Sequence, residues 1–436
     1  MIPPWWILLG LLFLRWWLAS LPGYVPDVNA YKRWALRAGL DGIHTIYDGE
    51  GRDFDYPPLY AYLLAPVARF YDLVVPGAAR ARADTGIFTI LVKIPPLTFD
   101  VLLALLLSLA VDRLGLWGAA GRHRFPPWLP GLLYMLHPAV LFDGGYWGQP
   151  DSVHTFFVFL ATVLLIAKRP GWAWTAATLG CLMKPPAAPF LPLLAVLTLL
   201  CCRVRGLIRG AVAASGTALL VFSPFLLTGR GTLLASRLLG DVGLMAYTSV
   251  NAHNLWWLLG PWKPAKEPAV LGLTPMQLGL GVFGLLYALL LLALLLERGE
   301  DRRPSAWIAA AGAVAVTFFA FSTHMHENHL FSFIPFTVAL AGRSKRWALI
   351  AAAAAITMLA NMAFGDLYLA YRLFAHIGGA SSYFHPDFKR NLSVFEFWLA
   401  KANSGLLLLV WLATVLGTAR EIGLRIPSSH PPRPAR

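Results

Sequence analysis

The sequence is poor in charge and in cysteine. Only 13% of its 436 residues are charged, against about 25% in soluble domains, and 58% are hydrophobic. This composition excludes an ordinary soluble domain and indicates a polytopic membrane protein. Its three cysteines, Cys181, Cys201 and Cys202, lie within apolar runs and offer no disulfide framework. The sequence also lacks low-complexity stretches and short internal repeats.

Acidic residues are scarcer than basic ones, 22 against 36, which gives a formal net charge of +14. We do not expect a nucleic-acid partner, because the basic residues cluster in short connections between apolar segments, as cytoplasmic loops require. These clusters predict a multi-pass protein of the cell membrane (plasma or inner membrane) with both termini in the cytoplasm. They fall at 113–124, 168–169, 203–209, 298–303, 343–346 and 420–436.

The basic clusters predict an all-α integral membrane protein with about twelve transmembrane helices. The expected spans are 5–19, 86–111, 128–145, 151–167, 171–184, 187–202, 207–227, 276–296, 306–322, 329–342, 347–366 and 404–419. Segment 59–75 is also apolar, but counting it would invert every later basic cluster. We therefore expect it to lie flat on the membrane surface as an interfacial helix.

These spans divide the chain into three parts. Residues 1–342 form the main membrane module, with an extracytoplasmic loop at 21–86. Residues 343–420 add further transmembrane helices, and the proline-containing segment 421–436 is expected to be a disordered cytoplasmic tail.

The loop after the first span concentrates the scarce acidic residues. Carboxylates take protons from hydroxyl groups and aromatic rings stack on sugars, so this loop predicts a site for a polar ligand. Its acids are Asp27, Asp41, Asp48, Glu50, Asp53 and Asp55, interleaved with Tyr24, Tyr31, Trp34, Tyr47 and Tyr56.

Asp27 is the candidate general base. It follows the first span by a few residues, and Asp27, Tyr31 and Trp34 recur at helical spacing along one face. A carboxylate just above the bilayer can activate an acceptor hydroxyl. The alternative is that Asp27 caps a helix at 28–39.

Charged residues inside predicted spans are the next candidates, because each is costly unless paired or hydrated. Lys93 and Asp100 lie two turns apart on one helix face. Asp100 suits a structural ion pair at least as well as catalysis, whereas Lys93 could meet an anionic ligand. Pro185 and Pro186 break the helix after Lys184, which suits binding of a phosphate; a lysine reaching out from a helix end is the alternative.

Two further polar segments lie on the predicted outer side. The segment 143–151 carries Trp147, Gln149 and Asp151, and Asp151 suits either a ligand or the N-cap of the next helix. In segment 323–329, His324, His326 and Glu327 favour hydrogen bonding to a phosphate or sugar hydroxyl over metal ligation, because no fourth ligand is evident. We expect neither a metal nor a cofactor.

In their order, these motifs resemble the GT-C superfamily of polytopic glycosyltransferases, and most closely the bacterial relatives of the GPI-anchor and N-glycan mannosyl- and glucosyltransferases. The motifs that carry the resemblance are Asp27-x3-Tyr31-x2-Trp34-Ala35, Asp55-Tyr56-Pro57-Pro58-Leu59, Lys93-x6-Asp100, His137-Pro138, Tyr146-Trp147-Gly148-Gln149-Pro150-Asp151, Lys184-Pro185-Pro186 and Met325-His326-Glu327.

The resemblance implies a GT-C type fold and an inverting transfer of a hexose, mannose or glucose. The donor would be a polyprenyl- or dolichyl-phosphate sugar, and the acceptor a lipid, glycan or protein on the extracytoplasmic side. Asp27 would be the base, with Lys184, Lys93 and His326 at the donor phosphate. The implied substrate-binding residues are Tyr31, Trp34, Asp55, Tyr56, Trp147, Gln149, Asp151, His324 and Glu327.

The chain departs from the family around Met325-His326-Glu327, where related sequences carry arginine and this one has His324 and Asn328. Lys184, Arg230 or Arg237 could supply the missing phosphate contact. A transporter or flippase of polyprenyl-linked sugars is the alternative function, and an inactive scaffold is a third. A transporter predicts broken helices at matching positions in two similar halves, and only the break at Lys184 is evident.

Overall fold

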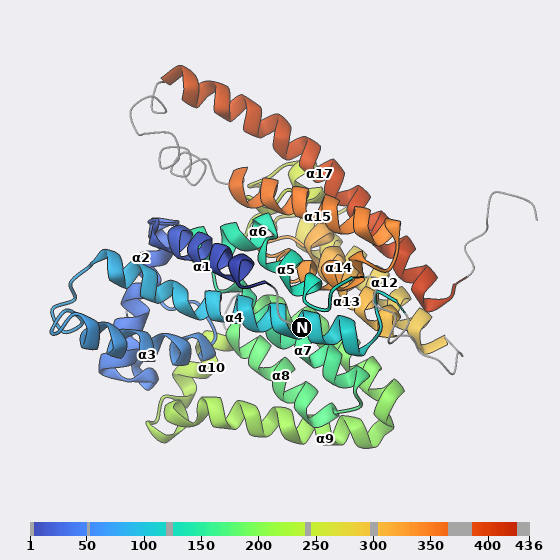
Figure 1. Cartoon of the computed structure of the whole chain (residues 1–436). Helices are drawn as coiled ribbons and strands as arrows, with labels where there is room; N and C mark the ends of the chain where they lie inside the picture. The colour runs from blue at the N-terminus through green and yellow to red at the C-terminus, as the bar shows by residue number, and fades with distance from the viewer. Residues whose placement is uncertain are drawn as a thin grey trace, which may run out of the picture.

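The structure is a computed structural model that describes residues 4–49, 53–118, 125–239, 246–296, 304–364 and 386–424. Within these residues the chain is mostly helical, with one pair of two-residue strands. Figure 1 shows α9 along the lower edge and α17 along the upper edge, with the other long helices between them.

Six described helical segments are long and apolar enough to cross a membrane, which supports a multi-pass membrane protein. Helix α1 (Trp5–Ser20) is apolar too, but it meets the length criterion only when it is counted together with the helix after it, from which it is bent by 91°. The six are α4 (Gly86–Arg113), Pro185–Leu227, α12 (Pro275–Leu296), α13 (Pro304–Phe321), α15 (Lys345–Phe364) and Val394–Ile422 of α17 (Pro386–Ile422).

Among the described residues these candidate spans do not confirm the predicted number of twelve, because several expected spans form shorter helices. With 14 residues, α8 extends about 21 Å, short of the hydrocarbon core of about 30 Å. Twelve therefore stays a prediction. The shorter helices are α5 (Leu129–Met135), α6 (Pro138–Val140), α7 (Asp151–Ile166), α8 (Pro170–Met183) and α14 (Phe333–Ala341).

The long helix α9 (Leu191–Leu227) is two arms joined at a break. Arg203 has a φ of 55°, which lies outside the helical region. The Trp174 ring donates a 3.0 Å hydrogen bond to Thr198, and the same ring lies against the α-carbon of Gly210. A straight helix would hold residues 198 and 210 about 18 Å apart, so α9 folds back at Arg203. The two arms correspond to the predicted spans 187–202 and 207–227.

The first loop is a compact helical layer. Helix α2 (Val25–Leu36) meets α1 at 91° and continues as the π-helix η1 (Arg37–Asp41), followed by the short 3-10 helix η2 (Ile43–Thr45). Because α2 carries Asp27 and several basic residues, we place it outside the membrane spans. Helix α3 (Leu59–Val74), the segment predicted to lie on the surface, is not among the candidate spans and packs Tyr60, Leu64 and Tyr71 inward.

The remaining described elements are short. They are the π-helix η3 (Leu141–Trp147), the 3-10 helix η4 (Pro185–Phe190), α10 (Gly231–Leu239), β1 (Ser249–Val250), α11 (Leu255–Leu259) and β2 (Met325–His326). Strands β1 and β2 pair in parallel, with Ser249 opposite Met325 and Val250 opposite His326.

Apolar side chains from α4 through α17 form one continuous core. The helices beyond residue 342, predicted as an addition, share that core rather than packing as a separate body. A second cluster joins α2 and α3 to α4 and to the end of α9. The predicted tail falls on the end of α17, which reaches Ile422, and otherwise on residues 425–436, outside the described residues.

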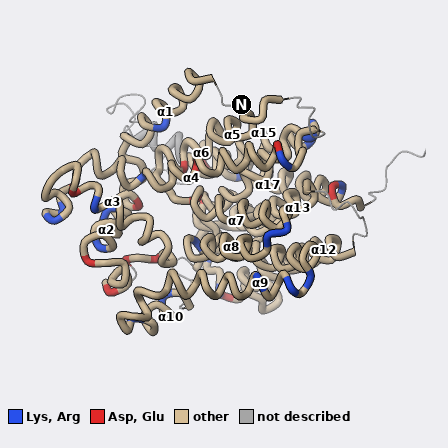
Figure 2. Tube along the Cα trace, turned by 60° about the horizontal axis from the view of Figure 1, so that its bottom comes forward, with Lys and Arg blue, Asp and Glu red and all other residues tan. Residues whose placement is uncertain are grey.

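Charged residues mark two ends of this helical body. Figure 2 shows acidic residues gathered around α2 and α3, with basic residues among them, whereas basic residues predominate at the opposite end near α9 and α12. The arms of α9 connect these ends, since Arg203 is at the turn and Phe225 contacts Tyr47 of the first loop. The described loop acids therefore lie at the end of α9 remote from its basic turn.

Candidate functional site

Asp27 sits where the first loop meets η3. It is the third residue of α2, whose N-cap is Tyr24, so the alternative role as a helix cap is wrong. Its Oδ2 instead accepts hydrogen bonds from Trp147 Nε1 at 2.9 Å and Gln149 Nε2 at 2.6 Å. Burial raises the pKa of Asp27 to about 6, and the bond from Trp147 and the charge of Lys184 oppose that rise only in part.

Gln149 bridges the carboxylate of Asp27 to the ammonium group of Lys184. While its Nε2 donates to Asp27, its Oε1 accepts from the Tyr56 hydroxyl at 3.2 Å and from Lys184 Nζ at 3.4 Å. Lys184 Nζ also lies 5.5 Å from the centre of the Tyr56 ring, within range of a cation–π interaction. One amide thus joins an acid, a phenol and a cation from three parts of the chain.

Lys184 lies in a break between helices, as the flanking prolines predict. Its backbone is extended between the end of α8 and η4. The side chain is 5% exposed and donates to Asp151 Oδ1 across 2.6 Å. A lysine buried against a carboxylate does not reach out to the membrane surface, so that alternative is excluded.

Asp151 completes a buried ion pair. It is the first residue of α7 and makes no capping hydrogen bond, so its alternative role as an N-cap is wrong. Its second oxygen, Oδ2, accepts from Asn328 Nδ2 at 2.6 Å. Both oxygens are therefore occupied, which fixes Asp151 between Lys184 and the histidine segment.

Lys93 points at backbone rather than at the Asp27–Gln149–Lys184 cluster. It is fully buried in α4 and donates to the carbonyl oxygens of Leu21 at 2.7 Å and Tyr146 at 2.8 Å. Gly23, with a φ of 67°, packs so close that a Cβ there would lie 2.5 Å from the Tyr146 oxygen. Through these two hydrogen bonds Lys93 links the α1–α2 turn to η3. Because Asp27 follows that turn and Trp147 ends η3, Lys93 keeps the two residues close together.

Asp100, the other charge on α4, serves the structural ion pair considered from the sequence. Arg15 Nη1 donates to its Oδ2 at 2.7 Å, and the Tyr134 hydroxyl donates to its Oδ1 at 2.9 Å. All three side chains are buried. This pair ties α1 to α4 and α5.

The aromatic residues of the first loop differ in position. Tyr31 and Trp34 are buried and pack against Tyr60, and Trp34 Nε1 donates to the Asp53 carbonyl. Their rings pack against other aromatic residues of the first loop and support the site, whereas the Tyr56 hydroxyl bonds directly to Gln149 in the polar cluster. Asp55 is exposed at its edge.

Most other described acids of the loop form exposed ion pairs. Asp53 pairs with Arg33 at 3.0 Å, and Asp48 pairs with Arg230 at 2.8 Å. Hydrogen bonds from Arg230 lower the pKa of Asp48. Arg230, a predicted alternative phosphate ligand, is thus already engaged.

The histidine segment pairs with the loop before α11. His324 has a φ of 63°, a strained conformation for a residue with a side chain, and its amide donates to the Tyr247 carbonyl. The amide of His326 donates to His329 Nδ1 at 3.2 Å. Burial, with the charge of Lys184 acting in the same direction, lowers the pKa of His326 to about 4, so His326 is neutral at pH 7.

Glu327 lies beside His326, with 3.9 Å between Glu327 Oε2 and His326 Nδ1. Across the described ranges, no three histidine, cysteine or acidic side chains are grouped as metal ligands would be.

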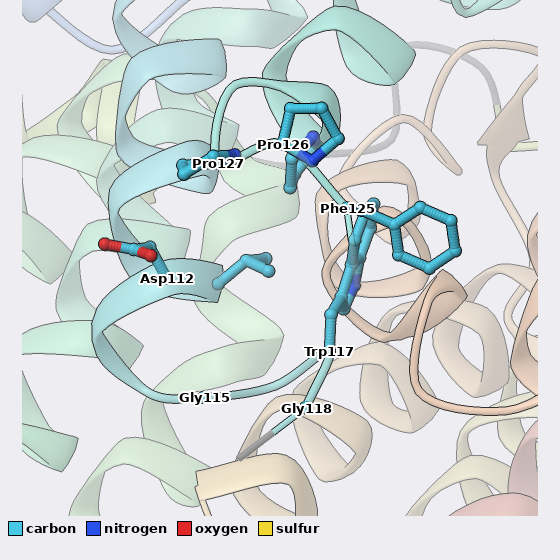
Figure 3. Close-up of a pocket in the computed structure, with 9 residues that line it drawn as sticks. Asp112, Gly115, Trp117, Gly118, Phe125, Pro126 and Pro127 are labelled. Atoms are coloured by element: carbon cyan, nitrogen blue, oxygen red, sulfur yellow. The ribbon is translucent and has the colours of Figure 1, made fainter. Parts of the chain in front are cut away.

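Two cavities lie away from this cluster. One, of about 20 Å³, is lined by Asp112, Trp117 and Phe125 at the C-terminal end of α4 (Figure 3) and has room for about one water molecule. Another, of about 200 Å³, lies between α12, α13 and α17. The Thr317 and Thr418 hydroxyls on its wall bond to backbone carbonyls, so they offer little to a sugar or phosphate.

The structure brings together Asp27, Tyr56, Trp147, Gln149, Lys184 and Asp151 from the predicted site residues, through the contacts described above. The sequence did not predict the hydrogen bond from Asn328 to Asp151, because Asn328 was considered only as a residue that replaces the arginine of related sequences. Sequence reasoning also missed Asn361, an amide within an alanine-rich span, although polar residues in spans are themselves a signal. No protein-family model and no curated protein matches the chain.

Proposed function

We propose that this protein is an inverting glycosyltransferase that moves a hexose from a lipid-phosphate carrier to an acceptor hydroxyl. The observation that carries the proposal is the Asp27 carboxylate, whose pKa is raised to about 6 and which is joined through Gln149 to Lys184. A base of this pKa is largely ionised at pH 7 and still accepts a proton. The order of the GT-C-like motifs along the chain supports the same reading.

In the proposed reaction the acceptor oxygen attacks the anomeric carbon of the sugar. The bond from that carbon to the phosphate oxygen breaks, and the electron pair leaves with the lipid phosphate. The acceptor proton passes to Asp27. Attack opposite the leaving group inverts the anomeric configuration. Trp147 and Gln149 hold Asp27 through Oδ2, and Oδ1 has no hydrogen-bond partner among the described residues, which leaves it for the hydroxyl.

Lys184 is the proposed partner of the leaving phosphate. Its ammonium group has three hydrogens; one meets Asp151 at 2.6 Å and the contact to Gln149 is long, at 3.4 Å. A phosphate oxygen would therefore compete mainly with Gln149. Neutral His326 and His329 would add N–H donors rather than charge.

The sidedness of the site belongs to the proposal. The loop acids lie at the end of α9 remote from the basic turn at Arg203. The positive-inside rule, applied to that turn, supports our proposal that the site faces the extracytoplasmic side, and the basic clusters along the chain favour cytoplasmic termini. Lipid-linked sugars are available there, and the acceptor can be a lipid, a glycan or a protein.

The test is direct. Purified protein is incubated with labelled polyprenyl-phosphate mannose or glucose and a membrane extract, and the product is identified by mass spectrometry. Asp27→Asn should abolish transfer without loss of folded protein. Asp41→Asn is the matched control, because Asp41 is an exposed loop acid 4.0 Å from Arg82, and it should transfer normally. Normal turnover by Asp27→Asn would remove Asp27 as the base.

The alternative, a transporter or flippase, gives a different outcome in the same system. In proteoliposomes a flippase would move labelled lipid-linked sugar across the bilayer without forming a new glycosidic bond. Translocation that persists in Asp27→Asn, with no transfer product from the wild type, would favour that function.

A further inference from the structure

The C-terminal helices α15 and α17 send polar side chains toward the histidine segment. Asn361 of α15 and Asn403 of α17 are 2% and 4% exposed. An amide buried in a membrane span is costly unless its hydrogen bonds are made. Where those bonds go indicates what each residue does.

Asn361 links two loops that come from different parts of the chain. Its Oδ1 accepts from the His253 amide at 2.5 Å, and its Nδ2 donates to the Glu327 carbonyl at 2.5 Å. Polar residues in spans commonly bond one helix to another. Both bonds of Asn361 instead leave the helices, one for the loop after β1 and one for the loop after β2.

Asn403 holds the same loop from α17. Its Nδ2 contacts His253 Nδ1 at 3.0 Å and the Thr357 carbonyl at 2.9 Å. An amide N–H can only donate, so Nδ1 of His253 is the acceptor and its proton lies on Nε2. Asn403 therefore hydrogen-bonds to the side chain of His253, and Asn361 hydrogen-bonds to its backbone.

This connection continues to the proposed site. Glu327, whose carbonyl Asn361 holds, precedes Asn328 in the chain, and Asn328 donates to Asp151. Asp151 in turn holds Lys184. A displacement of the Glu327 backbone would therefore move Asn328 and, through its hydrogen bond to Asp151, change the position of the Asp151–Lys184 pair.

We propose that Asn361 and Asn403 are positioning residues that set Asn328 against Asp151, which makes α15 and α17 part of the functional unit. The inference rests on the proposed function of the Asp27–Lys184 cluster for its catalytic meaning. Its structural content, that these amides order the loops at 247–254 and 323–329, can be measured without any activity.

The first experiment is hydrogen exchange by mass spectrometry on the purified full chain. Asn361→Ala should raise exchange in 247–254 and 323–329 about tenfold, because the His253 amide loses its acceptor. Thr357→Val is the matched control. It lies one turn earlier on α15, its hydroxyl makes only a 3.5 Å contact to the Asn403 carbonyl, and its own carbonyl still accepts from Asn403.

Unchanged exchange in both segments of a folded Asn361→Ala protein would overturn the proposal. If that variant does not fold, Asn403→Ala decides, since it removes the partner of the His253 side chain and leaves Asn361 in place. Faster exchange in 247–254 supports the proposal, and unchanged exchange there refutes it.

The second experiment measures transfer kinetics. Asn361→Ala should raise the apparent KM for the polyprenyl-phosphate sugar about tenfold and leave the KM for the acceptor unchanged. A variant that merely contained less active protein would lower kcat and leave both KM values alone. If the wild type transfers no sugar, the proposed function fails, and the exchange result still judges the positioning role.

Discussion

Gln149 donates a 2.6 Å hydrogen bond to Asp27, and both residues come from places where a helix begins or ends irregularly. Asp27 lies two residues into α2, and Gln149 follows the π-helix η3, past Gly148 with a φ of 91°. The 122 residues that separate them in the chain leave no local pattern by which the pairing could be read. Four predictions depend on this arrangement.

The pH dependence of transfer should report Asp27. Because its pKa is raised to about 6 and the ionised form is the base, kcat/KM should fall about tenfold for each pH unit below about 6 and level off above it. Steady-state rates from pH 4.5 to 8 would measure this. A profile that stays flat through pH 5 would show that a different group accepts the proton.

Asp27→Asn should also make the protein more stable at pH 7. A folded-state pKa above the ordinary value of 3.8 means that the folded protein retains a proton that the unfolded chain releases. The stability that this proton contributes is present below about pH 4 and is lost as pH rises through 6.

The shift corresponds to roughly 3 kcal/mol before solvent screening, and partial exposure reduces our expectation to about 1–2 kcal/mol. Thermal unfolding in detergent would measure the gain in stability. The gain should vanish near pH 3.5, where both the aspartic acid and its asparagine replacement are neutral. A variant less stable than the wild type at pH 7 would contradict the conclusion that burial destabilises the charged form of Asp27.

The buried pair Lys184–Asp151 should show strong coupling in a double-mutant cycle. Lys184→Met leaves the Asp151 carboxylate buried without its cation and should cost about 3–5 kcal/mol of unfolding free energy. Asp151→Asn in the same chain should restore most of that loss, because Asn328 can still donate to residue 151.

In the same variants, the affinity for the donor distinguishes a structural role of Lys184 from a role in binding the phosphate. If Lys184 meets the phosphate, the double variant Lys184→Met/Asp151→Asn should be stable and still bind labelled polyprenyl-phosphate sugar poorly. Wild-type binding by the stable double variant would remove Lys184 from the phosphate site.

Gly23→Ala should disturb the turn that carries Asp27. The new Cβ would meet the Tyr146 carbonyl at 2.5 Å, so the turn must move away from η3 and Asp27 must move with it. Gly77→Ala is matched for backbone strain, since Gly77 has a similar φ of 78° but open space around it. Both variants should lose about 1 kcal/mol from the positive φ.

Only Gly23→Ala should lose transfer activity and a larger amount of stability. Thermal unfolding and initial rates would be compared for the two variants. If Gly23→Ala and Gly77→Ala changed stability and transfer rate equally, the α1–α2 turn bonded by Lys93 would not set the position of Asp27.

The sequence by itself determined the composition-level features of this protein. Long apolar runs set the helical, multi-pass character, because backbone groups in lipid must be satisfied within the helix. Pro185 and Pro186 fixed the break after Lys184, since proline lacks an amide donor. The basic cluster at 203–209 marked the turn in α9.

Only the tertiary structure decided which side chains meet. Asp27 and Asp151 both stand at helix starts, where the sequence alone left capping open as a role, yet packing gives each carboxylate a partner from a distant segment. Lys93 and Lys184 are both followed closely by two prolines, but one faces two carbonyls and the other a carboxylate. Local patterns set helix ends, whereas contacts between segments far apart in the chain depend on how every helix packs.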